Sequence, residues 1–393
     1  MPAVAAPGRP ELVDVFRVCG DGLEGSSAEQ RRVARAITSC RTAALGGHVR
    51  ECDQCGHREI SYNSCRNRHC PKCQGLERVR WQEAQAQDLL PVPYFHVVFT
   101  VPAVLDPLFL ANLRLAYGLL FEAVAQTLQE VAQNPKNLGA TVGFTAVLHT
   151  WTQTLLYHPH VHCIVPGGGL DPSGTRWVAA RRDFFLPVRV LSHVLRGKLL
   201  GGLERALEQG RLTVPSGVRP ARLLQKASRK KWVVYSKRPV AGPEQVLSYL
   251  GRYTHRIAIG NERLVSIDNG EVTFRYQDRA NGNRACTMTL DAAAFVRRFL
   301  LHVLPTGFVR VRHYGLLANA TRRDRIATCR RLLGVPETVS EPEPKESWVA
   351  MLLRLTGKDV TACPSCGTGR LHVVENIPRE GPHARIGARG PSP

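Results

Sequence analysis

Acidic residues are scarce in this 393-residue sequence, where 32 Asp and Glu stand against 53 Lys and Arg. The resulting formal net charge is +21, and the basic residues are spread along the chain instead of being gathered in one tail. A basic fold of this size is typical of proteins with a polyanionic partner, with nucleic acid as the default. A basic surface that serves only solubility, or an acidic membrane partner, is the alternative interpretation.

Long apolar runs and an export signal are also lacking. The most apolar long segment, residues 107–128, contains Arg114 and Glu122, so it predicts a buried or amphipathic helix and no membrane span. The first residues, MPAVAAPGRPELVDVF, do not combine a basic start with an apolar core. We therefore expect a cytoplasmic protein with no membrane partner. In that reducing compartment the 12 cysteines favour metal binding over disulfides.

Two catalytic patterns are missing as well. The sequence shows no cluster of carboxylates that would bind the paired ions of a two-metal nuclease. It also lacks the GxxxxGK[ST] pattern of a phosphate-binding loop. Any strand separation that its reaction needs would therefore come from a host helicase or from replication.

The segment CDQCGHREISYNSCRNRHCPKC contains the pairs Cys52-x2-Cys55 and Cys70-x2-Cys73. Two such pairs in one short segment predict a zinc ribbon, because each turn presents two thiolates and four thiolates complete a tetrahedral shell. A closed shell leaves no position for a substrate, so we expect this Zn²⁺ to be structural.

The remaining cysteines are less informative. Cys65 and His69 lie between the two pairs and are possible additional ligands or supports for ligands, with a free structural cysteine as the alternative for Cys65. Cys363-x2-Cys366 is a lone pair, which either completes a site with residues distant in the sequence or binds no metal. The others are expected to be small buried apolar residues: Cys19, Cys40, Cys163, Cys286 and Cys329.

Three histidines lie close together in YHPHVHCIVPGGG, residues 157–169. The run 160–165 predicts a strand in which His160 and His162 share one face, while the apolar residues between them share the other. Side chains two residues apart on a strand are roughly 7 Å apart at Cα, which lets both imidazoles converge on one metal ion. Histidines at the edge of a buried strand, without a metal, are the alternative. His158 is either a further ligand or a DNA contact.

A tyrosine pair lies downstream in SYLGRYTHR. The preceding Pro243 and the apolar pair Val246 and Leu250 predict a helix. Tyr249 and Tyr253 are four positions apart, so such a helix would present both phenols on one face. An aromatic stripe packed in the core is the alternative interpretation.

These motifs resemble those of the HUH endonucleases and, more closely, of the two-tyrosine transposases of the IS91 family of bacterial insertion sequences. The similar blocks are HVRECDQCGH, SYNSCRNRHCPKCQ, VLHTW, HPHVHCIVPGGG, WVVYSKRPVAGPEQVLSYLGRYTHRIAI and RVRHYGLLAN. They cover roughly residues 40–320, whereas the leader and the region after about 335 match weakly apart from the C-terminal CxxC.

The resemblance implies an α+β fold: an N-terminal zinc-ribbon-like module, then an HUH-type central antiparallel sheet flanked by helices, with the histidine strand in the middle and the tyrosine helix beside it. It implies that His160 and His162 hold Mg²⁺ or Mn²⁺. It also implies that Tyr249 and Tyr253 are the nucleophiles that cleave and rejoin single-stranded DNA through a 5′-phosphotyrosine, by a rolling-circle type of route. The zinc module would help to recognise DNA.

The resemblance leaves a third metal ligand open, because such enzymes usually add one polar residue to the histidine pair. The candidates near the right places in the sequence are Gln153, His149, His158, Gln245 and His255. Phosphate contacts, which position DNA without reading its sequence, are expected from Lys237 and from Arg310 and Arg312 in RVRHYG.

We expect a leader over 1–35, a zinc-binding DNA-recognition module over 36–90, a catalytic domain over 91–320 and a basic, partly disordered CxxC tail over 321–393. The expected partner is DNA at insertion-sequence ends, in the bacterial cytoplasm with the nucleoid. A rolling-circle replication initiator or a relaxase-like nicking enzyme would use the same chemistry. A non-catalytic zinc-ribbon DNA-binding regulator would explain the charge and the cysteines, but would leave the histidine and tyrosine pairs without a role.

Overall fold

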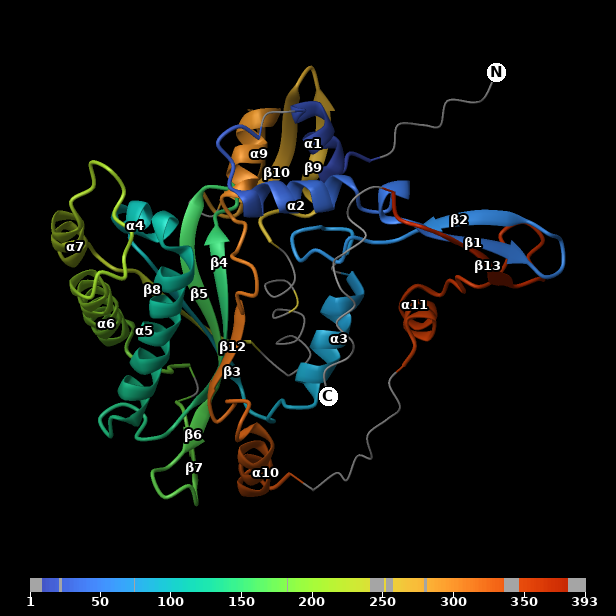
Figure 1. The fold of residues 1–393 in the computed structure, drawn as a ribbon. Coiled ribbons are helices and arrows are strands. Elements are labelled where there is room, and N and C mark those ends of the chain that lie inside the picture. Colours follow the sequence, from blue (N-terminus) through green and yellow to red (C-terminus); the bar gives the residue numbers. More distant parts are fainter. Residues whose placement is uncertain are drawn as a thin grey trace.

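The computed structural model describes residues 9–20, 23–73, 75–181, 183–240, 251, 257–278, 281–335 and 346–380, with the backbone alone at 238–240. Within these residues the fold is α+β, and its centre is a five-stranded antiparallel sheet in the order β12-β4-β5-β3-β8 (Figure 1). The strands are β3 (Tyr94–Thr100), β4 (Gly143–Trp151), β5 (Tyr157–Pro166), β8 (Val234–Val240) and β12 (Val311–Gly315). The histidine strand β5 lies in the middle of this sheet, which confirms the expected architecture.

One face of the central sheet is covered by helices (Figure 1). These helices are α4 (Asp106–Ala111), α5 (Leu113–Gln133), α6 (Val188–Glu208) and α7 (Pro220–Ser228). Phe121 and Val124 of α5 are fully buried in one core with Val161 and Cys163 of β5. Each such buried aliphatic or aromatic side chain contributes about 1.5–3 kcal/mol, so this core fixes the back of the histidine strand.

The opposite face of the sheet carries the histidines and is only partly covered by apolar contacts. Helix α3 (Gly75–Ala86) lies on this side (Figure 1), where its Trp81 packs against the buried Tyr94 of β3 and Ile164 of β5. Ile164 follows His162 by two positions and therefore shares its face. The cysteine-rich segment that ends at Cys73 is thus followed by a helix that borders the histidine face.

A second, smaller unit joins the start of the chain to residues 257–303. It contains α1 (Leu12–Cys19), α2 (Ala28–Thr38), the sheet β9 (Leu264–Asp268), β10 (Glu271–Asp278) and β11 (Arg284–Asp291), and α9 (Ala292–Leu300). Phe16 of α1 meets Phe299 of α9 edge to face, with ring centroids 5.8 Å apart. The first helices are therefore part of a shared core and not a separate leader.

A third sheet forms an arm that extends from the body (Figure 1). Its strands are β1 (Gly47–Cys52), β2 (Arg58–Tyr62) and β13 (Leu371–Ile377), in the order β13-β1-β2. The segment 321–380 contributes this last strand as well as α10 (Arg322–Leu332) and α11 (Trp348–Thr356). Most of the expected C-terminal tail is consequently folded against other parts of the chain.

The remaining described elements are short. A hairpin of β6 (Gly168–Leu170) and β7 (Trp177–Ala179) follows β5, and 3-10 turns occupy Ala43–Leu45, Ala103–Leu105 and Asn261–Arg263. Over the described part of the chain, no helix combines the length and the apolar character that a membrane span requires.

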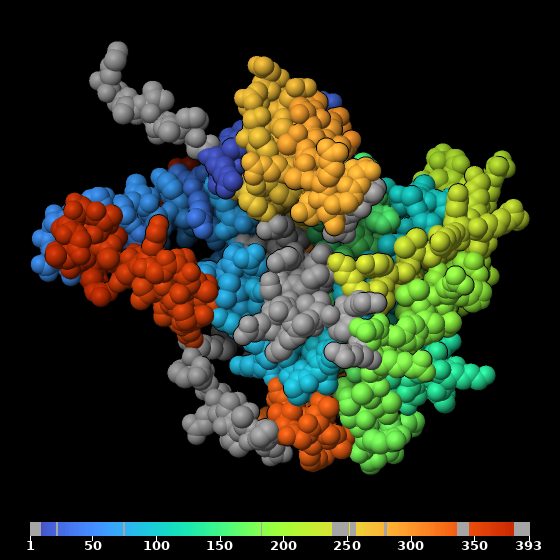
Figure 2. Space-filling model, turned by 180° about the vertical axis from the view of Figure 1, so that it is seen from behind, coloured from blue at the N-terminus to red at the C-terminus, as the bar shows by residue number. Residues whose placement is uncertain are grey.

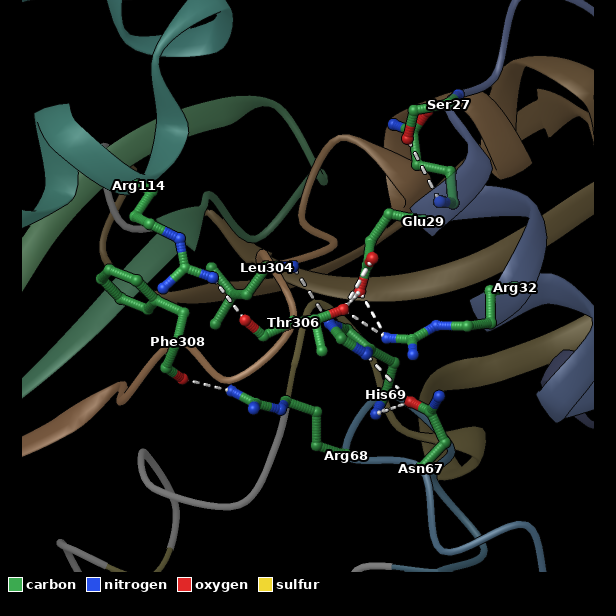
Figure 3. A network of polar contacts seen from close by, with 11 residues as sticks. Ser27, Glu29, Arg32, Asn67, Arg68, His69, Arg114, Leu304, Thr306 and Phe308 are labelled. Atoms are coloured by element: carbon green, nitrogen blue, oxygen red, sulfur yellow. Dashed lines mark hydrogen bonds and ion pairs between the residues drawn. The ribbon is translucent and has the colours of Figure 1, made fainter. Parts of the chain in front are cut away.

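A polar network fastens the cysteine-rich loop to the body (Figure 3). Arg68 donates to the carbonyl of Phe308 at 2.6 Å, and the hydroxyl of Thr306 donates to both carboxylate oxygens of Glu29, at 2.6 and 2.8 Å. The backbone N–H of Leu304 donates to Nε2 of His69 at 3.3 Å. These bonds join α2, the loop and the segment that leads into β12, so the cysteine loop has a fixed position beside the central sheet.

Candidate metal centres

The central strand presents its histidines as the alternation predicts. Val161, Cys163 and Val165 are fully buried in the helix-covered core, whereas His160 and His162 lie on the other face. His162 is 6% exposed, and His160 is half-buried. The His160 side of the pair is thus the more accessible one.

A third histidine joins this pair from the neighbouring strand. His149 of β4 stands directly opposite His160 in the antiparallel register and is itself only 4% exposed. Its ring centroid lies 4.4 Å from that of His162 and 5.5 Å from that of His160. One ring nitrogen from each residue lies within 4.8 Å of the other two. Among the candidates for a third ligand that the structure describes, Gln153, His149 and His158, the fold therefore favours His149.

The second ring nitrogens of the pair on β5 are engaged elsewhere. Nδ1 of His160 donates to the carbonyl oxygen of His158 at 2.6 Å, and Nδ1 of His162 lies 2.7 Å from Nε2 of His96 on β3. Metal-binding histidines usually use one nitrogen for the ion and the other for such a bond, which fixes the tautomer and the ring. His96 was not among the residues predicted from the sequence, although an imidazole inside the apolar run YFHVVFTV was a usable signal.

The donor set fits one divalent ion. Three imidazoles close three positions and leave others open for oxygen atoms of a substrate, as in catalytic sites. Imidazole is a borderline ligand, whereas Mg²⁺ prefers a shell of oxygen atoms. Of the two expected ions, Mn²⁺ therefore suits a site of three imidazole nitrogens better than Mg²⁺ does.

Arg310 lies beside the histidine cluster, defined as His149, His160 and His162. Its guanidinium carbon is 5.9 Å from the ring centroid of Trp151, which in turn stacks on His149 at 4.4 Å. Arg310 is only 6% exposed, and burial together with the nearby charge of Arg68 lowers its pKa to about 9. The group still carries a positive charge at neutral pH, separated from His149 by the ring of Trp151.

The other two expected phosphate contacts lie elsewhere. Lys237 is exposed on β8 at the end of the strand order. Arg312 of β12 lies over the rings of Phe121 and Phe308, at 4.3 and 5.3 Å, on the side of the helix-covered core. That packing gives Arg312 a structural role in cation–π contacts, while Lys237 remains accessible to a ligand.

Four cysteines form a first tetrad, called here the core cluster: Cys40, Cys65, Cys70 and Cys73. The sulfur of Cys73 lies 3.4 Å from that of Cys40 and 3.6 Å from that of Cys65. The tetrad is half-buried to buried beside the apolar residues of α1 and α9. Four thiolates in this arrangement are typical of structural zinc. Cys40, expected to be a small apolar residue, and Cys65 thus lie in one cluster with Cys70 and Cys73 and could act as ligands.

The other four form a second tetrad, called here the ribbon cluster: Cys52, Cys55, Cys363 and Cys366. The expectation that the two N-terminal pairs share one ion is therefore corrected. Pairing of β1 with β2 places the Cys52–Cys55 turn at the tip of a hairpin. Cys40 precedes β1, and Cys70 and Cys73 follow β2, so they belong to the chain at the base of that hairpin. Six residues of strand separate tip and base by roughly 17 Å, so the second CxxC clusters with Cys40 and Cys65 instead.

His69 is not a member of either tetrad. Its Nδ1 bonds to Asn67 at 2.9 Å, and its Nε2 accepts the N–H of Leu304. Burial lowers its pKa to about 3, so the ring is neutral and serves as a hydrogen-bonded anchor of the loop (Figure 3).

The remaining candidates are placed only in part. His158 lies with its ring centroid 5.3 Å from that of His160 but is outside the histidine cluster. The carbonyl of Gln153, in the turn after β4, accepts a bond from Arg263. Four candidates lie outside the described residues: Gln245, Tyr249, Tyr253 and His255.

Two family models match the chain. A putative transposase family, Y2_Tnp, matches residues 143–325, which include the histidine cluster. A transposase zinc-binding domain of the IS91 type matches residues 16–101, which include the whole core cluster.

Two similar proteins span almost the whole chain. The putative transposase y4qJ of Sinorhizobium fredii is 50% identical over 382 residues, covering 93% of this chain and 95% of that protein. The transposase for insertion sequence element IS801 of Pseudomonas savastanoi pv. phaseolicola is 29% identical over 354 residues, covering 86% and 82%. Among solved structures, a metal-bound conjugative relaxase TrwC in complex with oriT DNA covers 61% of this chain and 72% of its own at 14% identity, with a TM-score of 0.24.

Proposed function

The chain belongs to the IS91 family of transposases, and on this premise we propose that it cleaves and rejoins single-stranded DNA at the ends of an insertion sequence through a 5′-phosphotyrosine intermediate. The observation that carries this proposal is the histidine cluster, in which three imidazoles from β4 and β5 meet on the face of the sheet opposite the helix-covered core. A regulator that only binds DNA would have no use for such a cluster.

The histidine cluster would hold Mn²⁺ or Mg²⁺ through His149, His160 and His162. A bound divalent ion supplies Lewis acidity at a non-bridging phosphate oxygen of the scissile bond. The half-buried His160 marks the accessible side of the cluster, from which the phosphate would enter. His96 and the carbonyl of His158 hold the two rings of β5 in place, so the ligands need no reorganisation when DNA binds.

Tyr249 and Tyr253 are the proposed nucleophiles, and the support for this role is the sequence motif SYLGRYTHR that contains both. The phenolate oxygen of one tyrosine attacks the phosphorus atom, the bond from phosphorus to the 3′ oxygen breaks, and that oxygen takes up a proton to become a free 3′-OH. A free phenol has a pKa near 10, so the attacking group must lose its proton within the site. The phosphotyrosine bond conserves the energy of the cleaved bond, and rejoining by a 3′-OH therefore needs no ATP.

Basic side chains around the cluster fit an anionic substrate. The buried positive charge of Arg310 lies behind His149 and Trp151, where it would favour a phosphate at the cluster. The exposed Lys237 on β8 would contact the DNA backbone, which positions the strand without reading its sequence. The core cluster would hold the structural Zn²⁺ of the zinc-binding domain, and the expected host helicase or replication proteins would supply the single strand.

The proposal is tested with a labelled single-stranded oligonucleotide that contains an end of the insertion sequence. In the presence of Mn²⁺ we expect a protein–DNA adduct that survives denaturation, together with a product carrying a free 3′-OH. Replacing Tyr249 and Tyr253 together by phenylalanine should abolish the adduct, whereas the exposed Tyr235→Phe should not. An adduct that persists in the double variant would refute the assigned nucleophiles.

The metal assignment needs its own comparison. His160→Ala and His162→Ala should abolish cleavage while leaving DNA retention on a filter within a few-fold of the unchanged protein. Cleavage that continues in both variants would remove the histidine cluster from the mechanism. Replacing the insertion-sequence end with a plasmid origin distinguishes a transposase from a replication initiator or a relaxase-like enzyme.

A further inference from the structure

The ribbon cluster is built from two turns of the same design. The pattern Cys-x2-Cys-Gly occurs as CDQCG near the start of the chain and as CPSCG near its end. In the first turn the N–H of Gln54 lies 3.4 Å from the sulfur of Cys52, and in the second the N–H of Ser365 lies 3.4 Å from the sulfur of Cys363. Each closing glycine has a positive φ, of 70° or 71°, which only glycine adopts readily. Both turns therefore direct N–H groups at sulfur, an arrangement that stabilises thiolates.

The distances between the two turns match a metal site. The sulfur of Cys52 lies 3.7 Å from that of Cys366, and the sulfur of Cys55 lies 3.7 Å from that of Cys363. A regular tetrahedron of sulfurs around Zn²⁺, with Zn–S near 2.3 Å, has edges of about 3.8 Å. A disulfide would need about 2.05 Å. The separation therefore fits four thiolates around one ion.

The backbone around the cluster is shaped for this close approach. Gly369 donates its N–H toward the sulfur of Cys366 at 3.3 Å, and its carbonyl accepts the N–H of Cys363 at 2.9 Å. A β-carbon on Gly369 would lie 2.3 Å from the sulfur of Cys52 and 2.8 Å from the carboxylate of Asp53. Only a residue without a side chain lets the C-terminal turn reach the N-terminal one.

The arm has too small an apolar core to hold together without another contribution. Its buried cluster consists of Cys52, Cys363 and Leu371, with Cys366 packed against it. Three other large apolar side chains of its strands stay exposed: Ile60 at 55%, Val373 at 56% and Val374 at 51%. Small modules of this kind derive their folding free energy from a bound metal.

We propose that Cys52, Cys55, Cys363 and Cys366 bind a second structural Zn²⁺, which fastens the C-terminal segment 360–377 to the N-terminal hairpin. The family model for the zinc-binding domain ends at residue 101, so it does not include half of these ligands. The ligand pairs are separated by 314 and 308 positions in the sequence. In Figure 2 the late residues, in red, gather beside the blue residues of the hairpin at one end of the molecule. The arm is complete only once the whole chain has been synthesised.

Metal analysis of the purified full-length protein tests the stoichiometry, independently of any DNA cleavage. We expect two zinc ions per chain in the unchanged protein and in the control Cys286→Ser, which alters a half-exposed cysteine outside both tetrads. The double variant Cys363→Ser with Cys366→Ser should contain one. Equal zinc content in the double variant and the unchanged protein overturns the proposal.

Alkylation of the unchanged protein gives a second test that does not depend on the folding of a variant. Cys55 is exposed and Cys366 is half-exposed, so both should react with iodoacetamide if no metal covers them. In the zinc-loaded protein we expect both to resist, and to become reactive after a chelator is added, while Cys286 reacts throughout. Reaction of Cys55 and Cys366 at the rate of Cys286 before chelation overturns the proposal.

Gly369→Ala keeps every ligand and changes only the approach of the two turns. It should weaken retention of the second zinc ion at least ten-fold in a competition with a chromogenic chelator, because the new methyl group displaces Cys52. The control Gly197→Ala, in α6, adds a methyl group that meets no atom within 4 Å and should retain both ions. Unchanged retention in Gly369→Ala contradicts the proposed contact.

Discussion

The bond between His96 and His162 offers the sharpest test of how the histidine cluster is held. Nε2 of His96 lies 2.7 Å from Nδ1 of His162, and the two side chains are only 4% and 6% exposed. Leucine at position 96 would keep the apolar bulk within the strand but remove the bond. The ring of His162 would then lose both its fixed orientation and the tautomer that leaves Nε2 available to an ion.

The expected loss of Mn²⁺ affinity follows from the loss of the bond between His96 and His162. Loss of a hydrogen-bonded partner behind a metal-binding histidine typically weakens metal affinity by about 10- to 100-fold. That factor corresponds to about 1.4–2.7 kcal/mol. We therefore expect the Kd for Mn²⁺ to rise by one to two orders of magnitude in His96→Leu.

The assay measures free Mn²⁺ by electron paramagnetic resonance during a titration of zinc-loaded protein, alongside oligonucleotide cleavage at each Mn²⁺ concentration. His313→Leu is the matched control, because His313 lies in the same sheet and bonds through Nδ1 to Thr145 at 3.0 Å, outside the cluster. The half-saturating Mn²⁺ concentration should shift in His96→Leu and stay unchanged in His313→Leu, with cleavage restored at saturating Mn²⁺. Equal half-saturation in both variants would refute the reasoning.

Three further predictions concern stability and DNA affinity. Burial lowers the pKa of His302 to about 4, below about 6.5 in the unfolded chain, so protonation favours the unfolded chain as pH falls through that window. This group should lower the free energy of unfolding, measured in urea, by about 2 kcal/mol between pH 7 and 5. His302→Gln should remove that part of the pH dependence. Lys237→Ala should reduce the slope of log affinity for single-stranded DNA against log salt by about 0.7, while the exposed Lys136→Ala should not; equal slopes would exclude a phosphate contact. Gly315 has a φ of 59°, and an added β-carbon would meet a carbonyl oxygen, so Gly315→Ala should lower the free energy of unfolding in urea by about 2 kcal/mol or more. The control Gly118→Ala, in α5 with open space around it, should leave that free energy unchanged or raise it.

Local patterns predicted the middle strand of the central sheet and the helices that pack behind it. The alternation around His160 and His162 sets which side chains of β5 face the core. The apolar segment 107–128, predicted to form a buried or amphipathic helix, falls in α4 and α5. These predictions hold because they depend on neighbours within a few residues, where strand and helix periods act directly. The tyrosine pair, also a local pattern, stays a prediction.

The cysteines show where local patterns are insufficient. The sequence contains the right residue types for zinc, but spacing alone paired Cys52 and Cys55 with Cys70 and Cys73. The hairpin of β1 and β2 separates these pairs, and each is completed by residues from elsewhere in the chain. Cys40 had no local signal at all, since a single cysteine after a helix is commonly an ordinary apolar residue.

The sequence by itself determined the basic charge, the supply of thiolates and imidazoles, and the strand that presents two histidines on one face. Only the tertiary structure decided which distant residues meet them: His149 and His96 across the sheet, and Cys363 and Cys366 from the end of the chain. The physical reason is that side-chain direction follows from local backbone periodicity, whereas ligand partnership depends on strand register and on loop closure over hundreds of residues.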